Sequence, residues 1–528
     1  CLGLHFKRTV SGQPDDYRPP FFKGQTRKAV LDRWQARLDS TGVKQELPGL
    51  YNYEMDMKGK VGPMSVQLPL KDRLDSIENY FTDVKLDSEP ISEDAINATI
   101  KFFSRAGGIR VRSLYKTIEK MRKSTNSGNP WFTKRKNVVD LVMKSTIYWD
   151  AEKHEWWMST PDGHFGLCAL LGWRGQEGGL EVDDVKQRVV WMMSMILNAY
   201  ELTFYQPAIE AMQKNGLIPA YISMDKVDQE VTALFETKGV DDVVVCTDFT
   251  KFDQHFNRDM QNAAESVIRG LINRDCTSWI DQYFRPKFEI PLICSEDTMY
   301  TGEHGMGSGS GGTNFDECLG HKSLQFEAAL EQGVELNPHS QAYGDDAILS
   351  YPGINIKDVI RTYTRHGQVM NETKQYVSKH DCVFLRRWHG DTYRVNGVMV
   401  GVYSTFRALG RLLAQERFYD PDKWSAEMVE MRALSILENC KWSPVFHEFI
   451  DFVMTGDKYR LGIDLSGFYP NLEKIADKAM NEFGDDFLGY TKTLQREGES
   501  ANASNKTGIR GWSVVIYITT KYANEIKK

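Results

Sequence analysis

Two adjacent aspartates at a tight turn are the residues of this chain whose type and spacing point most directly to chemistry. Asp345 and Asp346 follow Gly344 within the run Gln341 to Leu349, where apolar residues flank the turn. Glycine permits the turn, and successive strand side chains point to opposite faces, so one carboxylate can project into a site while the other supports it. Nucleotidyl transfer uses such carboxylates to hold two Mg²⁺ ions. The same residues also have an ordinary turn composition, so this segment alone leaves both interpretations open.

A second acidic cluster lies upstream, at the end of a predicted strand. The run Val243 to Cys246 is rich in β-branched residues, as expected of a strand that is covered on both faces. Asp248 follows at the exit of this strand, and Asp253 comes shortly after it. Asp248 would then lie beside the Asp345 turn and supply a second metal-binding carboxylate. The alternative is that Asp248 only caps the next turn or helix.

A glycine-rich segment separates the two acidic clusters. Five glycines fall within Gly305 to Gly312, and a helical pattern follows from Phe315 to Gln332 with Thr313 at its start. Glycines let the backbone approach a ligand closely and expose its N–H groups, which suits a phosphate or a sugar. A flexible linker is the alternative, but such linkers seldom run straight into an amphipathic helix.

These three segments, taken in chain order, resemble motifs A, B and C of viral RNA-dependent RNA polymerases. The matching residues are Asp248-x4-Asp253, Ser308-Gly309-x3-Thr313 and Tyr343-Gly344-Asp345-Asp346. Residues 367–374 resemble motif D, 384–387 motif E, 125–130 motif G, and 186–190 the end of motif F. The resemblance covers roughly residues 120 to 390 in the order G, F, A, B, C, D, E. Within the family it is greatest to picobirnavirus polymerases, with partitivirus-like enzymes as the near alternative.

The resemblance implies template-directed RNA synthesis from NTPs. Asp248, Asp345 and Asp346 are then the catalytic ligands of two Mg²⁺ ions, with Mn²⁺ as a substitute, and Lys374 is the general acid for the pyrophosphate leaving group. The ribose 2′-hydroxyl is expected to donate a hydrogen bond to Asp253. The implied NTP-binding residues are Arg174, Lys186, Arg188, Asp253, Ser308, Gly309, Thr313 and Asn314.

The resemblance also implies contacts with RNA. The template is expected to meet the motif G residues Thr125, Ser127, Gly128 and Pro130. The primer or product strand is expected to meet the motif E residues Phe384, Leu385, Arg386 and Arg387. The partners implied are an RNA template, the product duplex, NTPs and a viral capsid protein. A double-stranded RNA genome, the virion interior and the host cytoplasm are implied by the family in the same way.

One position departs from the family pattern. Many members carry Asn four residues after the motif B threonine, where it helps to recognise the ribose, but this chain has Glu317 there. Asn314 is the candidate to take over part of that role.

The fold class implied is α+β, a right-hand polymerase with fingers, palm and thumb, in which an antiparallel palm sheet is flanked by helices. An N-terminal bridge is expected to close fingers onto thumb. A chain of 528 residues exceeds one hydrophobic core, so several subdomains are expected. The expected boundaries are 1–95 for the N-terminal extension, 96–235 for the fingers with 266–300 inserted from the palm, 236–265 and 301–395 for the palm, and 396–528 for the thumb and C-terminal segment.

The C-terminal part gives several local expectations. A helix is expected to begin after the N-cap Ser404, with Arg407 on a solvated face, and a second helix covers residues 426–438. Residues 496–508 are predicted to form a polar loop. The β-branched run 512–519 is predicted to form a strand.

Composition narrows the class of protein. The net charge is −7, yet residues 101–145 hold twelve Lys and Arg against two acids, and this basic stretch is a candidate template channel or else a solvated helical face. No apolar run reaches the ~18–20 residues of a membrane span, so no membrane partner is expected. Eight cysteines without a Cys-x-x-Cys pair predict reduced thiols rather than disulfides or a zinc site.

Two other functions share parts of this pattern. A reverse transcriptase also carries paired acids at a turn, but that family usually has a bulky residue where Asp253 stands. A non-enzymatic RNA-binding or capsid-associated protein would explain the basic stretch, but it gives no reason for carboxylates at Asp248 and Asp345. Comparing NTP with dNTP incorporation, and testing Mg²⁺-dependent synthesis, separates the three.

Overall fold

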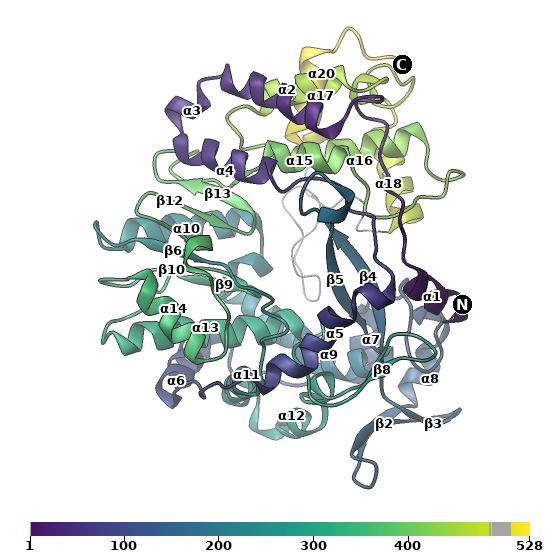
Figure 1. Cartoon of the computed structure of the whole chain (residues 1–528), viewed down its shortest axis with the longest axis vertical. Helices are drawn as coiled ribbons and strands as arrows, with labels where there is room; N and C mark the ends of the chain where they lie inside the picture. The colour runs from purple at the N-terminus through teal and green to yellow at the C-terminus, as the bar shows by residue number, and fades with distance from the viewer. Residues whose placement is uncertain (1, 485–486, 488–507) are drawn as a thin grey trace.

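A four-stranded antiparallel sheet carries the two acidic clusters (Figure 1). The computed structural model describes residues 2–484, 487 and 508–528. The strands of the central sheet run in the order β11 (Tyr376–Ser378), β6 (Val244–Thr247), β10 (Asp346–Leu349) and β9 (Gln341–Tyr343). The strand predicted before Asp248 and the hairpin predicted around Asp345 are thus both confirmed.

Both faces of the central sheet are covered. Val245 and Leu349 pack into the large core that contains α11 (Arg258–Leu271), α13 (Thr313–Glu331) and α14 (Ile356–Arg365). The alternate residues of the same strands, such as Val244 and Ile348, pack on the other face against α10 (Met224–Thr237) and β12 (Asp381–Phe384). This double burial explains why β6 has a run of apolar residues, Val244 to Cys246, instead of alternating apolar and polar residues.

The glycine-rich segment leads directly into α13, as predicted. Gly312 is the N-cap and the helix begins at Thr313, so the linker interpretation is wrong. α13 is buried along most of its length and packs against α6 (Glu93–Phe102), α11 and β9. The long helix α9 (Met195–Lys214) is buried on nearly all sides in the same core.

A second four-stranded sheet lies across from the central one. Its order is β5 (Lys186–Met192), β4 (Ala169–Gln176), β7 (Leu292–Ile293) and β8 (Met299–Tyr300), with β4 and β7 parallel. A three-stranded sheet projects beside it (Figure 1), formed by β1 (Thr146–Asp150), β2 (Glu155–Thr160) and β3 (Gly163–Gly166). A fourth sheet joins β12 to β13 (Arg387–Gly390) and β14 (Val402–Tyr403).

The N-terminal segment contacts both ends of the molecule. α1 (Leu2–Ser11) packs on β4, where the His5 ring lies 2.9 Å from the Leu171 carbonyl oxygen. α2 (Arg27–Asp39) and α4 (Pro48–Lys58) instead pack on α15 (Thr405–Leu412), and Trp34 Nε1 donates to Thr405 Oγ1 at 2.8 Å. From Phe21 onward, much of the first sixty residues therefore shares a core with the C-terminal helices (Figure 1).

The C-terminal part is helical. α15 begins after Ser404, whose hydroxyl caps it, and α16 spans Ala426–Glu438, so both predictions are confirmed. α17 (Phe446–Thr455), α18 (Leu472–Phe483) and α20 (Ser513–Lys521) complete this core. The short helices elsewhere are α3 (Val43–Glu46), α5 (Leu74–Thr82), α7 (Leu114–Lys120), α8 (Val139–Met143) and α12 (Ser278–Tyr283).

The strand predicted over residues 512–519 is wrong. This run forms α20, because Glu438 accepts hydrogen bonds from the N–H groups of Ser513 and Val514 in its first turn. These bonds satisfy backbone donors that a helix start leaves unpaired, and the helix buries Val514 and Ile518 on one face. Tertiary contacts thus override β-branched propensity here. All but the last residue of the polar loop predicted over 496–508 lies outside the described residues.

Two further expectations concern single side chains. Arg407 was expected on a solvated face, but it is 9% exposed and its Nε lies 3.1 Å from Glu177 Oε1, so that expectation is wrong.

The seven described cysteines are all free, which agrees for them with the prediction of reduced thiols. Among the described residues, no helix combines the length and the apolar character that crossing a bilayer requires.

Candidate active site

The three predicted catalytic aspartates lie at one end of the central sheet. β6 pairs with β10 so that Thr247 is opposite Ala347, and Asp248 and Asp346 therefore leave the ladder at the same end. Asp345 precedes Asp346 in the turn between β9 and β10. Burial, followed by the negative charge of Asp345 and more weakly that of Asp248, raises the pKa of Asp346 to about 7. The structure thus brings the three side chains into one acidic cluster, while their role as metal ligands stays a prediction.

Hydrogen bonds from outside β6 and β10 fix this cluster. Gln375 accepts a hydrogen bond from the Asp248 N–H and donates one to the Asp248 carbonyl oxygen, both at 2.8 Å. Asp346 Oδ2 accepts a hydrogen bond from the Leu385 N–H at 2.7 Å. Because one oxygen of Asp346 is used in this way, Asp346 is the supporting member of the aspartate pair and Asp345 the projecting one.

Asp345 keeps contact with solvent at the tip of the hairpin. Partial loss of water around its carboxylate, and next the charge of Asp253, raise its pKa, whereas Arg188 and Arg386 oppose the rise. These influences place one acid and two guanidinium groups within electrostatic range of Asp345. Gly344, before it, has φ +62°, a left-handed conformation that disfavours other residues.

Glu317, the residue that departs from the family pattern, lies in the same cluster. Its side chain is 5% exposed and hydrogen-bonded to Asp253. Burial, and then the neighbouring charges of Asp253 and Asp345, raise the pKa of Glu317 well above its usual range. This environment therefore favours the protonated form of Glu317, and its Oε1 has no hydrogen-bond partner among the described residues. The sequence flagged this position, but not the contact with Asp253.

The acidic cluster has the character of a cation site. In the described part of the chain, no group of three His, Cys, Asp or Glu side chains is arranged to hold a metal ion as it stands. Yet Asp248, Asp345 and Asp346 form no ion pair with a described Lys or Arg, so their charges are not neutralised within the protein. Hard oxygen donors with uncompensated charge fit Mg²⁺, which keeps water and substrate oxygens among its ligands.

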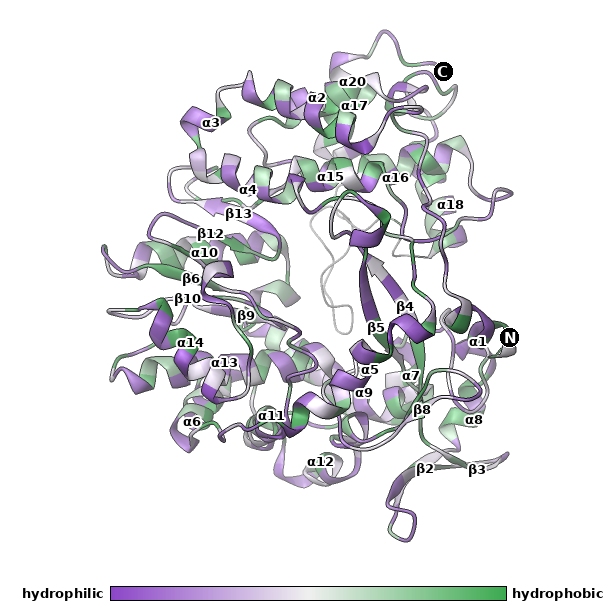
Figure 2. Cartoon of the chain, in the orientation of Figure 1, coloured by the Kyte–Doolittle hydropathy of each residue, from purple (hydrophilic) through white to green (hydrophobic). Residues whose placement is uncertain are grey.

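Cationic side chains lie on one face of the β4–β5 ribbon. Arg174 is directly opposite Arg188 in the ladder, and Lys186 follows on the same face of β5, whose first residues are hydrophilic (Figure 2). Arg188 and Lys186 are exposed and form no ion pair with the described residues. Arg174 differs, because its Nε lies 3.0 Å from Glu416 Oε1. Like charges placed directly opposite destabilise a ladder, which favours an anion bound between them.

The glycine-rich loop is held against the start of this region. A Cβ on Gly309 would lie 1.7 Å from the Trp191 carbonyl oxygen, so only glycine fits that position. Ser308 Oγ accepts a hydrogen bond from the Trp191 N–H at 3.3 Å, and Thr313 Oγ1 donates to the Gly307 carbonyl oxygen at 2.8 Å. The hydroxyls of Ser308 and Thr313 therefore shape the loop, whatever else they bind.

A buried carboxylate fastens the other side of the loop. Glu201 on α9 accepts hydrogen bonds from Ser310 Oγ at 2.5 Å and from the Gly311 N–H at 3.3 Å. Burial raises the pKa of Glu201 to about 7, although Lys287 and these hydrogen bonds oppose the rise. Nothing in the local sequence pattern distinguishes Glu201, and only its position on α9 opposite the loop reveals it.

Asn314, predicted to bind the NTP, and Lys374, the predicted general acid, lie in different surroundings. Asn314 Oδ1 accepts a hydrogen bond from the Tyr221 hydroxyl at 2.8 Å, so its amide is already partly used. Lys374 is exposed at the end of η9 (Glu372–Lys374), directly before the Gln375 that holds Asp248.

The four residues predicted to contact the product strand lie at the turn of the β12–β13 hairpin, and they differ in exposure. Leu385 and Arg386 form its turn, both with positive φ, whereas Phe384 is 1% exposed. Arg387 is 7% exposed and its Nη2 lies 2.8 Å from Asp228 Oδ2. The core takes the Phe384 and Arg387 side chains, so side-chain exposure does not support their contact with the product strand, which stays a prediction.

The predicted template residues divide in the same way. Thr125 is exposed and Pro130 half-buried, but Ser127 is fully buried and Gly128 packs on the Met193 carbonyl oxygen. The Ser127 hydroxyl accepts a hydrogen bond from the Thr133 N–H, so its side chain is used within the protein, and a template contact at Ser127 stays a prediction. Within the basic stretch, Arg112 is also unavailable, since it pairs with Glu210.

Comparisons with known proteins agree with this arrangement. A family model described as viral RNA-dependent RNA polymerase matches residues 92–394. A potential RNA-dependent RNA polymerase of human picobirnavirus (strain Human/Thailand/Hy005102/-) is 48% identical over 516 residues, which cover 97% of this chain and 95% of that protein.

Two solved structures are also similar to this chain. The crystal structure of the RNA-dependent RNA polymerase of a human picobirnavirus matches with a TM-score of 0.92 and 47% identity, covering 98% of this chain and 96% of the other. Its insertion loop deletion mutant matches with a TM-score of 0.89 and 44% identity, with the same coverage.

Proposed function

This chain belongs to the viral RNA-dependent RNA polymerases, and from that premise we propose that it joins nucleotides at the cluster of Asp248, Asp345 and Asp346. One observation carries the proposal. The register of β6 and β10 brings two acids from distant parts of the chain to one end of the sheet, where no described cation neutralises them. That arrangement costs stability, so a role in binding cations is the best reason for it.

The cluster fits two divalent ions. Bound Mg²⁺ would supply the charge that lowers the pKa of the 3′-hydroxyl and neutralises the leaving pyrophosphate. Asp345 projects toward the substrate, and Asp248 is held in place by Gln375. Asp346 orients the pair through its bond to Leu385. Catalysis then depends mostly on positioning and on charge stabilisation.

The exposed cations of β5 are suited to the triphosphate. Arg188 can bind phosphate oxygens in a bidentate way, and Lys186 adds a point charge beside it. Arg174 joins them only when its ion pair with Glu416 opens, so we place it second. Lys374, exposed and next to Gln375, is the proposed proton donor to pyrophosphate.

We propose that Asp253 and Glu317 together recognise the ribose of the incoming NTP. The Glu317 carboxyl group donates to Asp253 and holds that carboxylate in one orientation. Asp253 can then accept a hydrogen bond from a ribose 2′-hydroxyl, which a deoxyribose lacks. An acceptor left unpaired costs about 1–3 kcal/mol, so this contact favours ribonucleotides.

The domain assignment follows from the same premise. We propose a palm built on the central sheet, fingers that include the β4–β5 ribbon, and a thumb formed by the helices after residue 396. The contacts of α1 with β4, and of α2 and α4 with α15, support an N-terminal bridge between fingers and thumb. Thr125 and Pro130 are then available to the template, and Leu385 and Arg386 to the product strand.

The biological setting is also part of the proposal. A double-stranded RNA genome, association with a capsid protein, and work within the virion interior and host cytoplasm follow from the family resemblance.

A primer-free assay tests the central claim. The purified full chain is given a short RNA and all four NTPs, with and without Mg²⁺, and a parallel reaction contains dNTPs. We expect Mg²⁺-dependent RNA products and little DNA. Equal use of dNTPs would favour a reverse transcriptase, and absence of any product, despite intact folding, would favour a non-enzymatic RNA-binding protein.

A further inference from the structure

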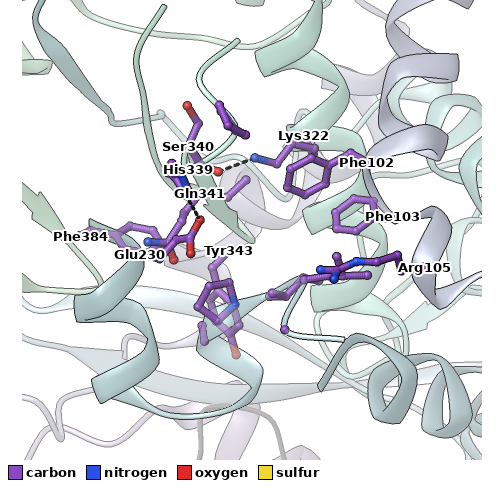
Figure 3. A pocket seen from close by; sticks show the side chains of 17 residues that line it. Phe102, Phe103, Arg105, Glu230, Lys322, His339, Ser340, Gln341, Tyr343 and Phe384 are labelled. Carbon is purple, nitrogen blue, oxygen red and sulfur yellow. Dashed lines mark hydrogen bonds and ion pairs between the residues drawn. The ribbon is translucent and has the colours of Figure 1, made fainter. Parts of the chain in front are cut away.

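A cavity of about 300 Å³ lies against the edge strand of the central sheet, and the proposed reaction makes no use of it. β9 contributes Gln341, Ala342 and Tyr343 to its wall, whereas Asp345 does not line it. Segments 102–105, 216–220 and 338–340 and the side chains of Glu230, Lys322 and Phe384 close it (Figure 3).

Lys322 is the unusual group in this cavity. Its side chain is 3% exposed, and its Nζ donates a hydrogen bond to the Ser340 carbonyl oxygen at 2.6 Å. The ammonium also lies 4.8 Å from the centre of the Phe102 ring. An ammonium has three donors, and the described residues accept from only one of them. No described carboxylate lies within ion-pair distance of it, and the more distant charge of Glu230 is the main influence that favours its charged form.

The rest of the wall has both apolar and charged parts. Lys322, Phe102, Phe103 and Arg105 follow one another along one side in Figure 3, and Tyr343 faces them. The rings of Phe102 and Phe103 meet edge to face, with centres 4.9 Å apart. Arg105 is exposed and donates to the Asn215 carbonyl oxygen at 3.0 Å, so it marks the open rim.

The acidic group of the wall is already paired. His339 Nδ1 lies 2.7 Å from Glu230 Oε1, and this pair is half-buried. Arg105 and Lys322 are two formal cations on the wall against the acid Glu230, whose bond to His339 is an ion pair only when that ring is protonated. This excess of positive groups, and the two unused donors of Lys322, favour an anion over a neutral or cationic ligand.

We propose that this cavity, called the β9 cavity below, binds a small planar organic anion whose charged group meets Lys322 and whose ring lies on Phe102 and Phe103. The volume is at the lower end of the range for ligand pockets, which suits one or two fused rings. A carboxylate and a phosphate ester share the chemistry that Lys322 recognises, and the experiment separates them. Burial lowers the pKa of Lys322 to about 7, and an anion beside it would restore the charged form.

Such a ligand is placed to act on catalysis. β9 pairs with β10, with Tyr343 opposite Asp346 and Ala342 opposite Ala347. Tyr343 lines the cavity and lies two residues before Asp345. A ligand that changes the position of β9 therefore moves the turn that carries the catalytic acid, and by linkage substrate binding changes the affinity for the ligand.

Binding is measured first, without RNA synthesis. The full chain is titrated by calorimetry with 2-naphthoate, with 2-naphthyl phosphate and with neutral 2-naphthylmethanol. We expect both anions, or one of them, to bind at a single site and at least about tenfold more tightly than the alcohol, since a charge-assisted hydrogen bond is lost with the alcohol. The anion that binds more tightly shows whether the site prefers a carboxylate or a phosphate ester. Equal binding of the alcohol, or no saturable binding of either anion, overturns the proposal.

Variants locate the site. Lys322→Met preserves the length of the side chain and should weaken anion binding at least about tenfold, whereas the matched control Lys357→Met, on exposed α14, should leave it unchanged. Arg105→Gln changes only the rim, so it should fold normally and weaken anion binding severalfold. Unchanged affinity in both Lys322→Met and Arg105→Gln would show that the anion binds elsewhere and would overturn the proposal.

The coupling to catalysis is tested last. This test can fail while the proposed function still holds. The anion, at a concentration that saturates the wild-type chain, should change its RNA synthesis at least twofold and should have a smaller effect on Arg105→Gln at the same concentration, because the weaker affinity of this variant leaves part of the chain unoccupied. Unchanged synthesis by a saturated wild-type chain would overturn the coupling while leaving polymerase activity established.

Discussion

Glu317 is hydrogen-bonded to Asp253 beside the turn that carries Asp345, and burial together with the charge of Asp253 raises the pKa of the Glu317 carboxyl group well above its usual range. A protonated carboxyl group offers one donor and one acceptor, much as an amide does. Glu317 can therefore serve where many relatives of this family carry asparagine. The price is a strong dependence on burial, because only the desolvated site keeps Glu317 protonated.

Replacement of Glu317 should test this equivalence. Glu317→Gln keeps a donor toward Asp253 and should preserve discrimination between NTPs and dNTPs. Glu317→Ala removes the donor and should lower the ratio of NTP to dNTP incorporation efficiency by about tenfold, corresponding to the loss of one buried hydrogen bond to a charged group. Single-nucleotide incorporation kinetics give the ratio. If Glu317→Ala discriminates as well as the wild type, Glu317 does not orient Asp253.

Asp345→Asn should abolish catalysis without unfolding the chain. The amide keeps the shape of the carboxylate but lacks its charge, so incorporation should fall by a factor of about 10³ or more. The melting temperature should stay the same or rise, because burial and Asp253 make the native charge on Asp345 unfavourable. Incorporation is measured on a short RNA alongside a thermal melt. Near-normal synthesis by this variant would remove Asp345 from the mechanism.

Glu201 should make stability fall as the pH rises. Its pKa is about 7 in the folded chain, above the ordinary 4.5, so the folded state binds the proton more tightly than the unfolded state. The free energy of unfolding that this group contributes is therefore fully present below pH 4.5 and is lost as the pH rises to about 7, by about 3 kcal/mol.

The measurement compares variants by urea unfolding at pH 5 and pH 8. Glu201→Gln should lose about that much less stability than the wild type between the two pH values. Glu335→Gln, at an exposed position, should behave as the wild type. Parallel pH profiles for Glu201→Gln and the wild type would show that Glu201 does not titrate in this range.

Gly309→Ala should displace the glycine-rich loop. The new methyl group would overlap the Trp191 carbonyl oxygen, 1.7 Å away, and backbone must move to relieve it. We expect a fall of about 10²-fold or more in nucleotide incorporation, because misplaced contacts of about 1 Å have effects of this size. Gly59→Ala is the matched control, because there the atom nearest to the new methyl group, the Asp56 carbonyl oxygen, is 3.6 Å away. Similar activity in both variants would mean that the loop position does not matter.

The position of the acidic cluster was largely predictable because local patterns determine the elements that carry it. An all-apolar β-branched run indicated β6, a glycine set the turn before Asp345, and loop glycines followed by an amphipathic pattern indicated α13. The family inferred from the order of these motifs is confirmed by the comparisons.

The remaining features depend on residues that are far apart in the chain. α20 became a helix because Glu438 binds its first turn, and Arg407 is buried because Glu177 reaches it. The Glu201 clamp and the Gln375 contact with Asp248 likewise join elements that no short window contains. Such contacts follow from packing of the whole chain, which local periodicity does not encode.

The shared core of the first sixty residues and the C-terminal helices has a consequence for synthesis of the protein. Trp34 cannot form its hydrogen bond to Thr405 until the ribosome has added 371 further residues. At ribosomal speeds of roughly 5–20 residues per second, the N-terminal apolar side chains remain uncovered for about 20–70 seconds. The nascent chain therefore needs protection from aggregation during that interval, and a truncated product that ends before α15 would leave those side chains permanently exposed.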